Sequence, residues 1–146
     1  MIQVKDVSSP SELDIAFEIR KKVFVEEQNV PIAEEYDEFE VTANHILAFY
    51  NDKPVGTARV RLTEKGSKLE RFSVLREYRM LGVGSELVKN LLTKCRNRIE
   101  SYVYLYSQVQ ACDFYGKFGF VERGDFFLDA GIEHLEMYLK APDNPN

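Results

Sequence analysis

The sequence predicts one mixed α/β domain, built on a central sheet of six or seven strands with flanking helices. Three observations support this prediction. The chain has 146 residues, of which 45% are hydrophobic, enough for the core of a single domain. In the first half, segments that read as strands are joined by short polar turns, which favours antiparallel pairing. From residue 68 onward the order becomes strand, helix, strand, which predicts a parallel pair joined by a right-handed crossover.

The chain begins with a strand and a helix. Residues 2–7 alternate between apolar and polar side chains, as a strand does, and end at a Ser-Ser-Pro turn. Either Ser9 or Ser11 is expected to cap the following helix, which spans residues 11 to about 24 because its apolar residues recur at helical spacing.

Two antiparallel strands follow, over residues 45–50 and 54–62. The polar residues Asn51-Asp52-Lys53 between them predict a tight hairpin turn. In the second strand Thr57, Arg59 and Arg61 alternate with apolar residues, which predicts a strand buried on one face only.

A central strand over residues 68–74 leads into a glycine-containing loop and then a helix. The helix is indicated by Val83, Leu87, Leu91 and Cys95, which repeat every four residues. The first turn of a helix has N–H groups without intrahelical acceptors, and the helix dipole adds positive character there. Because Gly82-Val83-Gly84 exposes those groups, this stretch predicts a phosphate site. The spacing matches neither the dinucleotide nor the P-loop motif, which disfavours NAD and ATP.

The rest of the chain completes the sheet. A strand over residues 102–106 is expected beside the central strand, and two parallel strands that splay at their carboxyl ends leave a crevice. The other expected elements are a helix over 111–118, a strand opening at 120–121, turns at 124–125 and 129–131, a last strand over 132–139, and a flexible tail over 141–146.

Composition narrows the function classes. The net charge is −5 and no basic run stands out, which disfavours nucleic acid as a partner. The sequence has no apolar span of membrane length and no signal-peptide pattern, so we expect a cytoplasmic protein that makes no membrane contact. The two cysteines, Cys95 and Cys112, lack C-x-x-C spacing, and no cluster of histidine, cysteine and carboxylate has the spacing of a metal site.

Two motifs resemble a known family. Arg79-Met80-Leu81-Gly82-Val83-Gly84 is similar to the R-x-x-G-x-G/A pyrophosphate loop of the GNAT superfamily of N-acetyltransferases, and residues 114–120, FYGKFGF, resemble its F-Y-x-x-x-G-F segment. Residues 23–31, VFVEEQNVP, with the acidic tract at 34–40 and Asn44-His45, are similar to the ElaA-like branch. The G-I-x-H of that branch also occurs at 131–134, but its preceding aspartate is Ala130 here.

The resemblance implies a GNAT fold over residues 1–146 that binds acetyl-CoA. In such a fold, backbone groups of the central strand pair with the pantetheine arm and the glycine loop holds the pyrophosphate. The residues it assigns to the coenzyme are Phe72, Ser73, Val74, Arg79, Met80, Leu81, Gly82, Val83, Gly84, Ser85, Gln108, Phe114 and Lys117.

The resemblance also suggests catalytic residues. Tyr115 is expected to protonate the leaving thiolate, the alternative being a buried tyrosine anchored by a hydrogen bond. Glu70 is a candidate base, acting directly or through water, unless it forms an ion pair with Arg59 or Arg71. His134 is a second candidate base, with a structural histidine as the alternative.

The acidic segment suggests the acceptor. Glu27, Glu35 and Asp37 are expected to meet an amine, on a small molecule or on a protein or peptide, unless the segment is only a solvated loop. The function expected is acetyl transfer by direct attack in a ternary complex, by a monomer or homodimer. The alternatives are a non-catalytic acyl-CoA-binding or regulatory module, or a fold recruited as an interaction domain.

Overall fold

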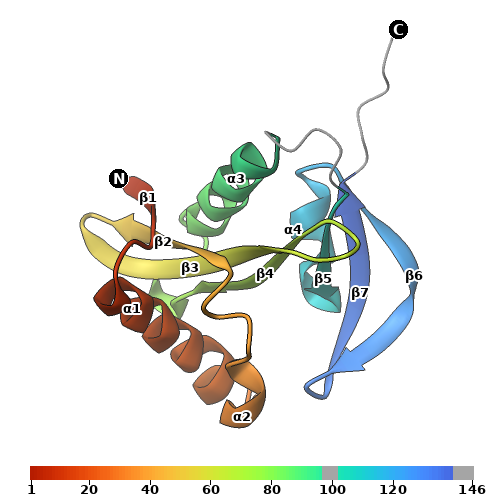
Figure 1. Ribbon diagram of the computed structural model, residues 1–146, viewed down its shortest axis with the longest axis horizontal. Coiled ribbons are helices and arrows are strands. Elements are labelled where there is room, and N and C mark those ends of the chain that lie inside the picture. The colour runs from red at the N-terminus through yellow and green to blue at the C-terminus, as the bar shows by residue number, and fades with distance from the viewer. Residues whose placement is uncertain (97–101, 140–146) are drawn as a thin grey trace, which may run out of the picture.

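The computed structural model describes residues 1–96 and 102–139 and contains one mixed seven-stranded sheet (Figure 1). The strand order is β1-β2-β3-β4-β5-β7-β6, with antiparallel pairing everywhere except between β4 and β5. The strands are β1 (Ile2–Asp6), β2 (Asn44–Tyr50), β3 (Lys53–Leu62), β4 (Ser67–Val74), β5 (Val103–Gln108), β6 (Phe120–Asp129) and β7 (Ile132–Leu139). The helical elements are α1 (Pro10–Arg20), η1 (Lys21–Glu27), α2 (Ile32–Glu35), η2 (Arg76–Tyr78), α3 (Val83–Arg96), η3 (Val109–Ala111) and α4 (Cys112–Gly116). The predicted mixed α/β fold is confirmed.

Helices cover both faces of the sheet. The larger core lies beneath α3 and α4, where the periodic residues Leu87 and Leu91 are fully buried. A smaller core lies on the other face, where Ala16 and Ile19 of α1 pack against Leu47 of β2. Because β3 lies between these two layers, it is buried on both faces from Val55 to Val60. The prediction of a half-buried strand was wrong here, and Arg59 is only 1% exposed.

The N-terminal helix is longer than expected. The Ser9 side chain caps it, accepting a hydrogen bond from the Glu12 amide, as predicted for one of two serines. Beyond Arg20 the chain continues as a π-helical segment to Glu27, so the predicted end near residue 24 was wrong. A π-helical turn carries an extra residue per turn and is often found beside functional sites. It brings Gln28 to the edge of the cavity described below.

Three hairpins join consecutive antiparallel strands: β2 to β3, β3 to β4, and β6 to β7. Asn51 and Asp52 both have positive φ values, of 47° and 69°, which is the two-residue turn that matches strand twist. The turn predicted at residues 129–131 is also present, at Ala130 and Gly131 between β6 and β7. The turn predicted at residues 124–125 was wrong, because β6 runs on through it with a register irregularity between Arg123 and Phe127. Gly124 has a φ of +80° and accommodates that irregularity within a strand.

The parallel pair separates at its carboxyl ends. β4 and β5 are paired only from Ser67 opposite Val103 to Leu69 opposite Leu105. Beyond this point β4 continues to Val74 and β5 continues to Gln108 without pairing to each other. The predicted splay between these strands is therefore confirmed. The expected tail over 141–146 lies outside the described residues. In the described ranges, no helix is both long and apolar enough to cross a membrane.

Candidate active site

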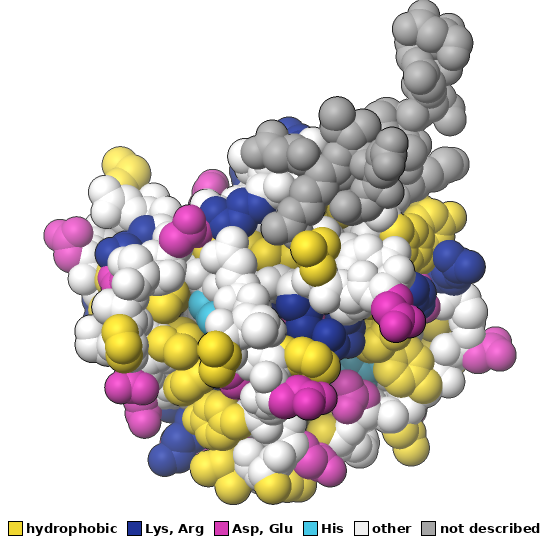
Figure 2. Space-filling view, in the orientation of Figure 1, with side chains coloured by type: hydrophobic (Ala, Val, Ile, Leu, Met, Phe, Trp, Pro, Cys, Tyr) yellow, Lys and Arg dark blue, Asp and Glu magenta, His cyan; other side chains and the backbone are white. Residues whose placement is uncertain are grey.

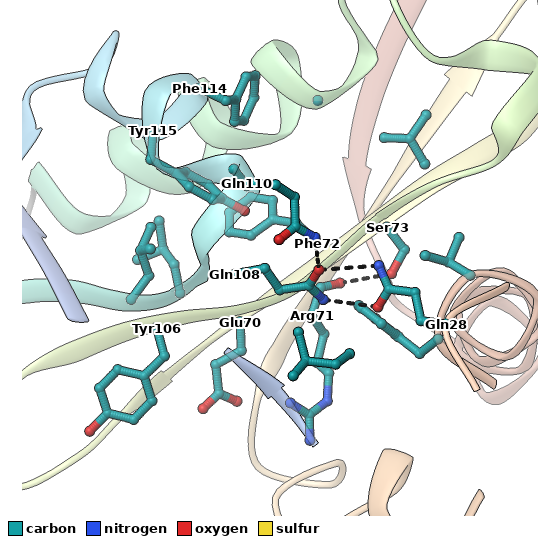
Figure 3. Close-up of a pocket in the computed structure, with 18 of the residues that line it drawn as sticks. Gln28, Glu70, Arg71, Phe72, Ser73, Tyr106, Gln108, Gln110, Phe114 and Tyr115 are labelled. Atoms are coloured by element: carbon teal, nitrogen blue, oxygen red, sulfur yellow. Dashed lines mark hydrogen bonds between the residues drawn. The ribbon is translucent and has the colours of Figure 1, made fainter. Parts of the chain in front are cut away.

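A cavity of about 650 Å³ opens where β4 and β5 separate (Figure 3). Its walls are β4, the segment leading into α3, the end of β5, α4, the β6–β7 turn, and an arm formed by η1 and α2. Most of the sequence-predicted residues meet here. Those that line the cavity are Glu35, Glu70, Phe72, Ser73, Val74, Arg79, Met80, Gly82, Val83, Gly84, Ser85, Gln108, Phe114, Tyr115 and His134. Leu81, Lys117, Glu27 and Asp37 are outside this lining.

One end of the cavity is the N-terminus of α3. The amide of Glu86 donates a hydrogen bond to the Gly82 carbonyl at 3.1 Å. The amides before it therefore belong to the first turn of the helix, where N–H groups have no intrahelical acceptor. Gly82 has a φ of +92°, a conformation that favours glycine. A Cβ on Gly84 would lie 3.3 Å from the Phe114 ring, so a side chain here would require that ring to shift by a few tenths of an ångström. These features make a cradle for an anion at the start of a fourteen-residue helix.

The middle of the cavity is shaped by a bulge in β4. Against β3, Glu70 pairs with Arg59 and Ser73 with Thr57, so two residues of β4 lie opposite one residue of β3. One of the two is Arg71, whose φ is +58°. The bulge interrupts the normal alternation of side chains where β4 and β5 have already separated.

Tyr115 of α4 lies beside this bulge. Its ring packs edge-on against Phe72, with 5.5 Å between centroids, and against Phe114, with 5.1 Å. Figure 3 shows its hydroxyl directed into the cavity, and among the described residues the hydroxyl makes no hydrogen bond. Burial raises the pKa of the phenol, so at neutral pH it is a proton donor. The alternative of a tyrosine anchored by a hydrogen bond is not what this geometry shows.

The Glu70 carboxylate is held by three cations. It accepts hydrogen bonds from Arg59 and from Arg61 at 2.9 Å, and lies 3.0 Å from the Lys68 ammonium. Burial alone would raise the pKa of Glu70, but the charges of Arg59 and Lys68 outweigh it and the pKa is lowered. The ion pair with Arg59, one of the two alternatives for this residue, is therefore present, and a carboxylate so stabilised accepts a proton reluctantly.

His134 lies on β7 opposite Gln108 of β5. Its Nδ1 donates to the Ile132 carbonyl at 2.7 Å, since a carbonyl only accepts. In the neutral ring this bond leaves Nε2 as the acceptor. The ring stacks on Phe127 at a centroid distance of 5.9 Å, which fixes its orientation.

Three glutamine amides cross the cavity (Figure 3). Gln28 and Gln108 exchange hydrogen bonds of 2.8 and 3.3 Å, and Gln110 donates to Gln108 at 2.6 Å. They join the helical arm to the end of β5. The sequence indicated Gln108, but Gln28 and Gln110 were missed, although Gln28 stands within the V-F-V-x-E-Q motif.

The acidic segment is neither a solvated loop nor free to meet a ligand with all its charges. It belongs to a buried ion cluster, which we define by its members: the cations Arg20, Arg59, Arg61, Lys68 and Arg71, and the carboxylates Glu35, Asp37, Glu40 and Glu70. Glu35, only 3% exposed, accepts from Arg20 at 2.6 Å. Arg59 donates to Asp37 at 2.7 and 2.9 Å, and this contact outweighs burial to lower the pKa of Asp37 to about 2.

The remaining predicted residues lie at the rim. Glu27 faces Arg79, which donates to it at 2.6 and 2.9 Å and also to the Val74 carbonyl at 2.9 Å. Met80 and Leu81 are exposed at the loop. Across the described residues, no group of histidine, cysteine and carboxylate side chains has the arrangement of a metal site.

Comparisons with known proteins agree with this geometry. A family model for the GNAT acetyltransferase domain matches residues 6–141. YjcF of Bacillus subtilis (strain 168), described as an uncharacterized N-acetyltransferase, is 44% identical over 127 residues, which are 86% of this chain and 91% of that protein. ElaA of Escherichia coli (strain K12) is 31% identical over 134 residues, 88% of each chain.

Solved structures show the same fold. The crystal structure of Escherichia coli ElaA has a TM-score of 0.86 at 29% identity, covering 96% of this chain and 100% of that one. A Bacillus anthracis acetyltransferase in complex with acetyl coenzyme A has a TM-score of 0.58 at 24% identity, covering 68% of this chain and 63% of that one. At that identity the second comparison speaks for the fold alone.

The splayed sheet, the glycine loop before α3 and the cavity between them define a GNAT acetyltransferase domain, and the chain belongs to this family. Within the family, its likeness to ElaA in sequence and in structure assigns it to the ElaA-like branch. The resemblance drawn from the motifs is thereby confirmed. The general class of the protein is that of the acyltransferases.

Proposed function

We propose that this protein transfers the acetyl group of acetyl-CoA to a primary amine by direct attack in a ternary complex. One observation carries the proposal: a single cavity connects the N-terminus of α3 with the gap between β4 and β5, and the Tyr115 hydroxyl enters it without a hydrogen bond to any residue that the structure describes. The Bacillus anthracis acetyltransferase, which has this fold, was crystallised with acetyl coenzyme A, and this adds support.

On the donor side, the amides of residues 80–85 would hold the pyrophosphate, because the first turn of a helix has N–H groups without intrahelical acceptors. Backbone groups of residues 72–74 would pair with the pantetheine as an added strand does, and the Gln108 amide would bind it from the opposite wall. Arg79 would contribute positive charge at the rim, where its guanidinium forms an ion pair with Glu27. Phe114 packs beneath the loop at Gly84, and Lys117, exposed after α4, would add charge nearby.

In the reaction, the amine nitrogen attacks the thioester carbon, a C–N bond forms and the C–S bond breaks. The thiolate takes the proton of the Tyr115 hydroxyl, and the phenolate is then reprotonated by the proton that the attacking nitrogen releases as it becomes an amide. The amine must lose a proton, and for a lysine-like amine with a pKa of about 10.4 this costs roughly 4.6 kcal/mol at pH 7. Nε2 of His134 is the acceptor we favour, because Glu70 is neutralised by its cations and would need an intervening water. Neither cysteine lines the cavity, which supports direct attack without an acyl-enzyme.

The test is free-thiol release from acetyl-CoA against a panel of amines, matched to acetylated product. The Tyr115→Phe variant keeps the ring packing but has no proton to give. We expect its kcat to fall about 100-fold or more, the usual contribution of a general acid. Its affinity for CoA, measured by calorimetry, should be unchanged. Binding of acetyl-CoA with no thiol release for any amine would instead identify a non-catalytic acyl-CoA-binding module.

A further inference from the structure

We propose that the acceptor amine also carries a carboxylate, in the manner of an amino acid, and that Arg71 recognises this carboxylate. The inference rests on the proposed acetyl transfer and names the substrate class for the same site. It begins from a difference among the three arginines of the buried ion cluster that pair with carboxylates of the acidic segment: Arg20, Arg59 and Arg71.

Two of these arginines are buried, and each of their guanidinium nitrogens donates at least one hydrogen bond. Arg20 donates through Nε, Nη1 and Nη2 to Glu35 and Glu40, and is only 1% exposed. Arg59 likewise donates through all three nitrogens to carboxylates, and is also 1% exposed. Their role is to hold the acidic segment against β3 and β4. Within the described residues Arg59 uses all five of its guanidinium N–H groups and Arg20 uses four of five, and both side chains are too buried to meet a ligand.

Arg71 is different. Within the described residues its guanidinium makes one hydrogen bond, from Nη2 to Asp37 at 3.3 Å. Its Nε is buried without a hydrogen-bond partner in the part of the chain that the structure describes, and the nearest carboxylate oxygen, of Glu35, is 3.9 Å away. A buried guanidinium N–H without an acceptor is unfavourable, and a bidentate carboxylate is the acceptor that a guanidinium fork fits best.

The position of Arg71 suits an acceptor. The residue lies in the β4 bulge with its φ at +58°, directly before Phe72, where the thioester end of the coenzyme would begin. It lines the cavity, and a quarter of its side chain is exposed. Figure 3 shows its side chain leaving β4 toward the helical arm, on the side away from Tyr115.

The charge balance favours an anion. The buried ion cluster has five cations and four carboxylates, and His45 beside it has a pKa lowered by burial. This excess positive charge would repel a purely cationic acceptor. Figure 2 shows side chains of both signs meeting in the middle of the visible face, between α2 and the β6–β7 hairpin. A ligand carboxylate would bring the cluster to neutrality.

The experiment compares matched acceptors in the thiol-release assay: amino acids, their carboxamides and the amines obtained by removing the carboxylate. We expect kcat/KM to be at least tenfold higher for an amino acid than for its two analogues, the size of a charge-assisted hydrogen bond. Arg71→Gln should remove this preference and raise KM for the amino acid about tenfold, with the KM for acetyl-CoA unchanged. Arg71→Lys should retain part of the preference, because it keeps the charge and loses the fork. Arg123→Gln, on exposed β6, controls for net charge.

Calorimetric binding of the amino acid to the protein–CoA complex gives a readout that does not require turnover. Binding that is lost in Arg71→Gln supports the inference even if no thiol is released, in which case the proposed acetyl transfer fails alone. Equal turnover of amino acids and their decarboxylated amines, or a preference that survives in Arg71→Gln, overturns the inference and leaves acetyl transfer standing. Turnover only on the lysine or N-terminal amine of a peptide overturns it as well.

Discussion

The buried ion cluster allows a sharp test of what Glu70 does. In Glu70→Gln the shape of the side chain is kept and its charge is lost, so Arg61 and Lys68 lose their carboxylate partner and Arg59 loses one of three. Breaking a buried ion pair from one side costs about 3–5 kcal/mol. The remaining amide oxygen still accepts one hydrogen bond, worth about 1 kcal/mol. We therefore expect a loss of about 2–4 kcal/mol in the free energy of unfolding.

The measurement is urea unfolding, with Glu136→Gln as the matched control. Glu136 also lies on a strand and pairs with a lysine, Lys65, at 2.9 Å, but that pair is at the surface. An exposed pair contributes about 0–1 kcal/mol. If the two variants lose the same stability, the cluster does not hold the fold as we argue. The kinetic counterpart is that kcat of Glu70→Gln should fall less than that of Tyr115→Phe, because Glu70 is not the favoured base.

The pH dependence adds an independent check. The folded-state pKa of Glu70 lies below its unfolded value of about 4.3. Its charge therefore contributes stability that is present above this pH and is lost as the pH falls through the folded pKa. The stability gap between the wild type and Glu70→Gln should be full at pH 7 and should narrow below about pH 4. A gap that is constant from pH 7 to the acid transition would contradict the ionised role.

Two further predictions concern the loop and the core. Gly82→Ala places a Cβ on a residue with a φ of +92°, and the backbone strain is about 1–2 kcal/mol. Acetyl-CoA binding, measured by calorimetry, should therefore weaken about 5- to 30-fold. Gly124→Ala imposes similar strain at a φ of +80° far from the cavity, so it should lower the melting temperature without changing that affinity. Leu91→Ala, at a fully buried position of α3, should cost about 2–5 kcal/mol in urea unfolding, whereas Leu62→Ala, at a 64% exposed position, should cost under about 1 kcal/mol. Equal losses for the two leucines would show that the core beneath α3 is misassigned.

The sequence alone determined the fold and the end of the cavity that we propose for the coenzyme. These depend on short-range patterns: the four-residue apolar repeat of α3, the glycines before it, and the strand–helix–strand order that predicts a parallel pair. Each of these patterns depends on local backbone geometry, which is set by residues close together in the sequence. The resemblance of the glycine loop and of residues 114–120 added Tyr115, because that segment keeps its place in the fold.

Only the tertiary structure decided the end of the cavity that we propose for the acceptor. The charges of Arg20, Glu35, Asp37, Arg59 and Glu70 are dispersed over fifty residues, and nothing in their spacing tells which of them pair. The acidic tract looked like a surface that attracts an amine, yet packing brings it against three arginines and neutralises it. The bulge at Arg71 is equally invisible in sequence, since it arises from the register between β3 and β4. Long-range pairing of charge and a one-residue shift in a sheet are properties of the folded chain, and these two properties shape the acceptor end of the cavity.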